Sequence, residues 1–195
     1  MNPITELHQT VDAYTAKLAE ASAKAGRPIT CAGKGCCHCC YEPVYCSDAE
    51  VKHILEGLDE HTLAKLSART EAYLERVEPT GLFKKDMPHV MEWLAMKLPC
   101  PFLEDGRCSV YDRRPLSCRA HIAVGPPDWC RDRRMEQTYP EADEVSIAIS
   151  EAIVRFHSKI GDTAIHDNML ALLEGELLGE HHPTASAQQI VFKKD

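Results

Sequence analysis

The sequence lacks long apolar runs, secretion signals and low-complexity tracts, and each absence excludes a class of protein. No segment approaches the roughly 18 consecutive apolar residues that a membrane-spanning helix needs. The opening MNPITELHQT has neither the basic nor the apolar stretch of a secretory signal, so we expect a cytoplasmic protein. A hydrophobic share of 44% with 27% charged residues excludes a chain that is disordered throughout.

Several motifs with known chemistry are also missing. The chain has no G-x-x-x-x-G-K-[ST] phosphate loop, no G-x-G-x-x-G dinucleotide turn and no H-E-x-x-H metalloprotease helix. Its net charge of −8 makes nucleic acid an improbable partner, and nothing indicates a membrane partner. No acid–base pair points to a reaction, so the sequence leaves open whether the protein is an enzyme.

Cysteine is what the chain has in excess. Of its ten cysteines, six lie between Cys31 and Cys46 and four between Cys100 and Cys130. A cytoplasmic protein keeps its thiols reduced, and a chain of 195 residues can bury a core without disulfides. The two cysteine islands therefore require a chemical explanation.

The spacing within the first island is typical of metal binding. Cys36 with Cys39, and Cys37 with Cys40, form two interleaved C-x-x-C pairs, whose turn brings two thiolates to one ion. Neighbouring side chains should diverge, so we expect Cys39 and Cys40 to serve different metals or different edges of one cluster. A bacterial ferredoxin run is excluded because Glu42 occupies the position of its third cysteine. The wider spacing of the second island is typical of remote ligands that fold back onto a primary site.

The charges and histidines near the islands allow two interpretations. Seven arginines and three aspartates between Arg107 and Arg134 give this segment a local charge of +4, which could balance a thiolate-rich metal site. The alternative is an ordinary solvated face or a set of carboxylate pairs. His38 and His121 are possible nitrogen ligands, although we expect His38 to face solvent. The other histidines, His8 among them, are expected at the surface.

Two blocks carry a family resemblance. C-x4-C-x2-C-C at residues 31–40 and PCPFLEDGRCSVYDRRPLSCRAH at residues 99–121 resemble the YkgJ-like cysteine-cluster family, also described as a CxxCxxCC zinc- or iron-chelating domain. The likeness covers about residues 31–130. It implies eight candidate metal ligands: Cys31, Cys36, Cys39, Cys40, Cys100, Cys108, Cys118 and Cys130. Cys37 and Cys46 are additional to the pattern, and Cys46 is the best candidate for a thiol that is merely packed.

Three functions fit these observations. The first is a metal-binding protein that holds two or more zinc ions in a structural, sensing or metal-handling role. The second is an iron–sulfur protein with a 4Fe-4S cluster, acting in electron transfer or supporting an unidentified enzyme activity. The third is a thiol redox protein. Metal ions are the expected partners, and the sequence identifies no protein partner.

The apolar periodicity predicts a single, mainly α-helical domain over residues 1–195, with two irregular cysteine-rich loops converging on a metal site. The cysteine-cluster core covers about 31–130, with flanking helices at 4–25 and 143–179 and a loose tail at 183–195. Within the core, a capping box of Ser47 and Glu50 opens one helix, a second runs to Val77, and a shorter one starts near residue 86. Short strands are expected at 107–111 and 120–124. The helical region 143–179 divides into two helices, at about 143–160 and 165–179.

Overall fold

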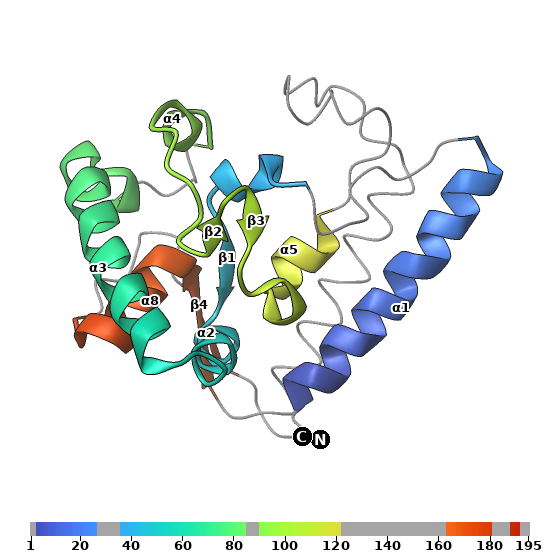
Figure 1. Cartoon of the computed structure of the whole chain (residues 1–195), viewed down its shortest axis with the longest axis horizontal. Coiled ribbons are helices and arrows are strands. Elements are labelled where there is room, and N and C mark those ends of the chain that lie inside the picture. The colour runs from blue at the N-terminus through green and yellow to red at the C-terminus, as the bar shows by residue number, and fades with distance from the viewer. Residues whose placement is uncertain (1–2, 27–35, 85–89, 122–162, 181–187, 192–195) are drawn as a thin grey trace.

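The computed structural model describes residues 3–26, 36–84, 90–121, 163–180 and 188–191, and within them the chain is mainly α-helical, as predicted (Figure 1). None of the described helices is long and apolar enough to cross a membrane. The described α-helices are α1 (Pro3–Lys24), α2 (Asp48–Leu55), α3 (Glu60–Val77), α4 (Val90–Ala95), α5 (Leu116–Ala120) and α8 (Met169–Leu178). Four short 3-10 helices join them: η1 (His38–Tyr41), η2 (Glu78–Thr80), η3 (Leu82–Lys84) and η4 (Tyr111–Arg113).

Two small antiparallel sheets complete the described fold. Strand β4 (Thr163–Asn168) lies between β1 (Tyr45–Ser47) and β5 (Gln188–Val191), so the end of the first cysteine island pairs with residues far along the chain. Strands β2 (Leu103–Glu104) and β3 (Arg107–Cys108) form a separate hairpin inside the second island.

Several predicted helices are confirmed with their ends. Helix α1 matches the expected helix 4–25, and α3 ends at Val77 just before Pro79. Gly81 and Gly179 adopt the left-handed conformation, with φ of +67° and +77°, and each terminates the helical segment before it. A glycine at such a position indicates the end of a helix, because glycine accepts positive φ without the steric cost that a Cβ imposes.

The C-terminal region was predicted wrongly in two places. Residues 163–168 form a strand, so the last helix starts only at Met169, where the side-chain oxygen of Asn168 accepts a hydrogen bond from the Leu170 amide at 2.9 Å. The spacing of Ile165 and Met169 imitates a helical period, but the pairing of Ile165 with Gln189 of β5 holds Ile165 in a strand. Within the tail that was expected to be loose, residues 188–191 form β5. The predicted helix at 143–160 lies outside the described residues.

The second island also differs from its prediction. Residues 116–120 form helix α5, where only irregular loop and a strand beginning at Ala120 were expected. The expected strand at 107–111 is limited to Arg107–Cys108, because η4 begins at Tyr111. Helix α4 begins at Val90, and the residues immediately before it lie outside the described part of the chain. Helices as short as α5 have little intrinsic stability, so contacts with the rest of the protein fix them.

The apolar core extends directly to the cysteine islands. Helices α2, α3 and α8 enclose a cluster that contains Val51, Ile54, Leu66, Leu172 and Leu173. A second cluster lies between the end of α3, α4 and α8. Cys100 and Cys108 pack against the first cluster, so the core supports one side of the cysteine-rich region.

A buried carboxylate joins the start of α2 to the start of α5. Glu50, 3% exposed, accepts hydrogen bonds from the amide and the hydroxyl of Ser47, both at 2.9 Å, and thereby forms the predicted capping box. Its other oxygen accepts the amide of Leu116 at 2.8 Å. One side chain therefore satisfies donors at the beginnings of two helices that lie 66 residues apart in the sequence.

Replacement of this carboxylate should destabilise the protein strongly. Glu50→Ala leaves the buried amides of Ser47 and Leu116 without an acceptor, so we expect the free energy of unfolding to fall by about 2–4 kcal/mol. Glu71→Ala, on the exposed face of α3, is the matched control and should change it by no more than about 0.5 kcal/mol. Urea unfolding followed by circular dichroism measures both, and equal effects would contradict the bridging role of Glu50.

Candidate metal site

The first cysteine island folds into a tight turn. The Cys40 amide donates to the carbonyl of Cys37, and the Glu42 amide to the carbonyl of Cys39, both at 3.0 Å, which forms η1. The turn directs Cys36, Cys39 and Cys40 to one cavity. Cys37 is half-buried and does not line that cavity. Of the two cysteines that are additional to the family pattern, Cys37 is therefore not among the thiols that line this cavity.

The hairpin brings two cysteines of the second island to the same place. The Cys100 amide donates to the carbonyl of Cys40, which joins the two islands directly. The β2–β3 register then pairs Leu103 with Cys108 across a turn in which Asp105 and Gly106 have φ of +47° and +72°. Asp-Gly is a typical two-residue hairpin turn. The Asp105-Gly106 pair is therefore the sequence signal for this hairpin, and it was missed in the prediction of the elements.

Helix α5 contributes the third cysteine of this island. Pro115 precedes the helix, and Glu50 accepts the amide of its first residue, Leu116, so the direction of α5 is fixed at its N-terminus. Cys118 lies in the middle of the five-residue helix and faces the same cavity as Cys100 and Cys108.

Six thiols from both islands line one cavity of about 130 Å³. They are Cys36, Cys39, Cys40, Cys100, Cys108 and Cys118. Apolar side chains, including Val44, Phe102 and Met169, form much of the remaining wall. No aspartate or glutamate lies among the described residues that line the cavity. Within the described residues, no three cysteine, histidine or carboxylate side chains already form a metal-binding group. Cys31 and Cys130, the other two predicted ligands, lie outside the described residues.

Four of these thiols form a mutually interacting group, which we call the thiol tetrad: Cys39, Cys100, Cys108 and Cys118. Burial is the main cause that raises the pKa of Cys118 to about 12, and the neighbouring Cys39 and Cys108 contribute to that rise. Burial is also the main cause that raises the pKa values of Cys100 and Cys108, and Cys39 contributes to both. Because ionisation of any one thiol disfavours ionisation of the others, the thiols are neutral at pH 7 without a metal, and a metal must displace their protons.

Cys39 and Cys40 were expected to diverge, but their side chains lie together. A hydrogen bond between their side chains is the main cause that raises the pKa of Cys39, and burial is the second. Both side chains also line the same cavity. The 3-10 geometry of η1 explains the difference, since it closes the backbone more tightly than the extended geometry in which adjacent side chains point apart.

A comparison with known protein families identifies the family to which the chain belongs. A family model described as a "putative zinc- or iron-chelating domain", CxxCxxCC, matches residues 30–146, which is more than half of the chain. The chain belongs to the CxxCxxCC family. The match makes this a metal-binding protein, and it includes all eight predicted ligands while excluding α1. Comparisons with curated proteins and with solved structures gave no match.

Two arginines of the CxxCxxCC domain line the thiol cavity. The Arg114 guanidinium lies 3.9 Å from the centre of the Tyr111 ring, donates to the Tyr111 carbonyl at 2.8 Å, and lowers the pKa values of Cys108 and Cys118 against the effect of burial. Arg119 is 3% exposed and donates from Nε to the carbonyl of Arg114 at 3.0 Å. Both therefore place positive charge beside the thiols, as the first interpretation of this segment requires.

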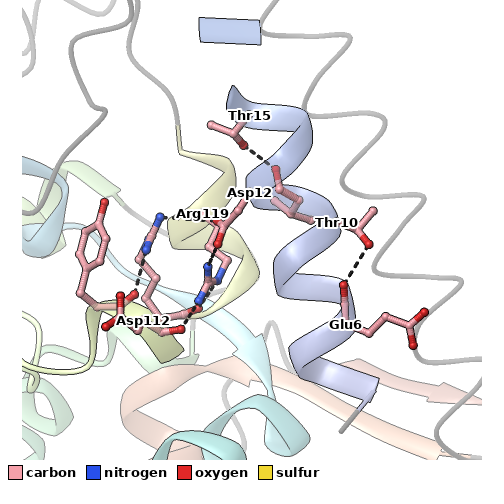
Figure 2. A network of polar contacts seen from close by, with 9 residues as sticks. Glu6, Thr10, Asp12, Thr15, Asp112 and Arg119 are labelled. Atoms are coloured by element: carbon pink, nitrogen blue, oxygen red, sulfur yellow. Dashed lines mark hydrogen bonds and ion pairs between the residues drawn. The ribbon is translucent and has the colours of Figure 1, made fainter. Parts of the chain in front are cut away.

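Arg119 and two further arginines, Arg113 and Arg69, also have structural roles. Figure 2 shows Arg119 between Asp112, whose carbonyl accepts from Nη2, and Asp12 of α1, whose carboxylate accepts from Nη1. Arg113 donates to the carbonyl of His53 at 3.1 Å, and Arg69 of α3 donates to the carbonyl of Pro101 next to Cys100. These side chains tie the loops of the domain to neighbouring helices. Arg107 is exposed, and Arg131, Arg133 and Arg134 lie outside the described residues.

The remaining candidates separate clearly. Cys46 is 1% exposed within the apolar core, and burial is the main cause that raises its pKa. His121 lines the thiol cavity, whereas His38 does not. His8 was predicted at the surface, and that prediction is wrong. It lies on the buried face of α1, beside Ile4 and Val11, and is only 5% exposed.

Arg119 should be essential for the arrangement around the thiols. Arg119→Met keeps an apolar side chain of similar length but leaves three carbonyl and carboxylate acceptors without their donor, so we expect the free energy of unfolding to fall by about 3 kcal/mol. Arg107→Met, at an exposed position, should have an effect of no more than about 0.5 kcal/mol. Urea unfolding compares the two variants, and similar losses would show that the contacts of Arg119 contribute little.

Proposed function

We propose that this protein holds two zinc ions through its cysteine thiolates, and that the metal locks the two cysteine islands together. The observation that carries this proposal is the shared cavity, whose walls contain six thiols from both islands. The islands are irregular in structure and far apart in sequence, so a bound metal would stabilise the fold as well as occupy the cavity.

The donor set favours a thiophilic metal. Calcium and magnesium take oxygen ligands, and the described lining offers no carboxylate. Sulfur donors select zinc, iron–sulfur clusters or copper(I). His121 could add a nitrogen donor, which zinc also accepts. A zinc ion bound in this way would supply charge neutralisation and a rigid junction.

The number of thiols supports two ions. A structural zinc ion takes four ligands, so two ions have eight coordination positions. The eight predicted ligands, with Cys31 and Cys130 included, supply one thiolate for each position. The six thiolates that line the cavity would fill eight coordination positions only if two of them each bound both ions. Eight thiolates with two zinc ions carry a charge of −4, and the guanidinium groups of Arg114 and Arg119 would offset part of it.

The thiol tetrad favours a second candidate function. A 4Fe-4S cluster takes four thiolates, and every member of the tetrad interacts electrostatically with the other three. A cluster held there would make the protein an electron carrier or a support for an enzymatic partner. Cys36 and Cys40 would then remain as additional thiols, which is why we rank this function second.

Metal analysis separates the two functions. Protein purified without oxygen should be colourless and contain two zinc ions per chain by elemental analysis. A strong chelator should remove the metal and lower the thermal unfolding temperature, since the metal links separate segments. A brown protein with broad visible absorption and four iron ions per chain would reject the zinc function in favour of the 4Fe-4S cluster. Protein that contains neither metal and oxidises readily would favour the thiol redox function.

Substitution of single cysteines tests the ligand assignment. Cys39→Ser and Cys108→Ser should each lower the metal content by at least one ion per chain, because both thiols belong to the tetrad. Cys46→Ala is the matched control and should retain the full content, since Cys46 is packed in the core outside the cavity. Metal content is measured on the folded monomer fraction after gel filtration. Full metal content in both serine variants would contradict the assignment.

A further inference from the structure

Helix α1 contributes to the thiol cavity although it lies outside the matched domain. The family match begins at residue 30, whereas α1 ends at Lys24. Thr15 of α1 nevertheless lines the cavity, and α5, which carries Cys118, lies beside α1 (Figure 1). Ile4, His8 and Val11 are buried along the same face of the helix. The cavity of this protein therefore has a wall that the CxxCxxCC domain itself does not supply.

Helix α1 also holds the two arginines of the cavity. The Asp12 carboxylate accepts a hydrogen bond from Nη1 of Arg119 (Figure 2). The other carboxylate oxygen of Asp12 lies 3.9 Å from Nη2 of Arg114. Asp12 is about half exposed, whereas the Arg119 side chain is 2% exposed. If α1 moved away, a buried guanidinium would lose its carboxylate partner, and the cavity would gain uncompensated positive charge.

His8 of α1 is buried, and one of its ring nitrogens has no hydrogen-bond partner among the described residues. This nitrogen is the Nε2 atom. The ring lies edge-on to His53 of α2, with 5.8 Å between the ring centres. The charged and titratable groups around it are Arg119 and Arg114 from the α5 region, His53 from α2, and Asp12 from α1 itself. Only Asp12 would favour a protonated His8.

We propose that α1 is a pH-sensitive cover of the thiol cavity, closed by Asp12 and by a neutral, buried His8, and opened when His8 takes up a proton. That the cover protects bound metal rests on the proposed function, whereas its opening does not. An uncovered cavity would expose its thiols to chelators and to competing ligands. The occupant of the covered state is thus retained at neutral pH and exchanged more readily in acid.

The direction of the pH dependence follows from the closed state. Burial, and then the charge of Arg119, lowers the pKa of His8 from 6.5 to about 3 when α1 is in place. An open helix would return His8 to its ordinary value. The closed state therefore has its full stability above about pH 6.5 and loses it progressively as the pH falls toward 3. At pH 5 the linkage relation gives at most about a 30-fold shift toward the open state.

Hydrogen exchange at several pH values tests the cover. The purified full-length protein is compared at pH 7.5, 6 and 5, with exchange rates corrected for the intrinsic effect of pH. Protection of peptides from α1 should fall by about 10- to 30-fold between pH 7.5 and 5 in the wild type, while protection in α3 stays constant. In His8→Phe, which keeps a ring but cannot take up a proton, protection of α1 should change less than threefold. His8→Leu replaces that variant if it fails to fold, and His61→Phe, at an exposed position on α3, is the matched control.

The outcomes separate this proposal from the proposed function. Protection of α1 that does not depend on pH, or that falls equally in wild type and in the His8 variants, would overturn the cover. If metal is bound, its release to a chelator at pH 5 should be faster from wild type than from His8→Phe. If no metal is bound, the exchange result still decides on the cover, while the metal analysis rejects the zinc function.

Discussion

The arrangement of the thiol cavity depends on the buried carboxylate of Glu50. It closes the capping box at the start of α2, next to β1, and it accepts the amide at the start of α5. Helix α5 has five residues, too few to be stable alone, so its orientation is set from outside. Because Cys118 lies on this helix, the carboxylate determines where one wall of the cavity stands relative to the core.

The cavity is built around an electrostatic cost that a metal would remove. Burial and mutual repulsion keep the tetrad thiols protonated, and Arg114 only partly opposes this. A divalent ion compensates several thiolates at once, so the same crowding that disfavours free thiolates favours their joint coordination. The apolar side chains of the wall lower the local dielectric constant and so strengthen these interactions. Crowded thiols and a partly apolar wall would thus both favour the binding of metal.

The sequence predicted the elements whose signals are local. The capping box of Ser47 and Glu50 and the ends of α3 and α8 depend on residues a few positions apart, and all are present. The clustering of cysteines likewise predicted a shared site, and six of the eight candidates line one cavity. Strands β4 and β5 could not be recognised in this way, because their partners lie elsewhere in the chain. Nor could the burial of His8, since the groups that surround it belong to α2 and α5.

Helix α5 is held from two sides, and this couples the cavity to α1. Glu50 accepts a hydrogen bond from the amide at its N-terminus. Arg119, one residue after Cys118, donates a hydrogen bond to the carboxylate of Asp12. A displacement of α1 would therefore act on the residue adjacent to a cavity thiol, and a metal that fixed Cys118 would in turn favour the docked position of Arg119. By linkage the two effects are equal in free energy: docking of α1 would change the affinity for metal by the same factor by which bound metal changes the docking equilibrium. A segment outside the CxxCxxCC domain can in this way regulate the domain without supplying a ligand.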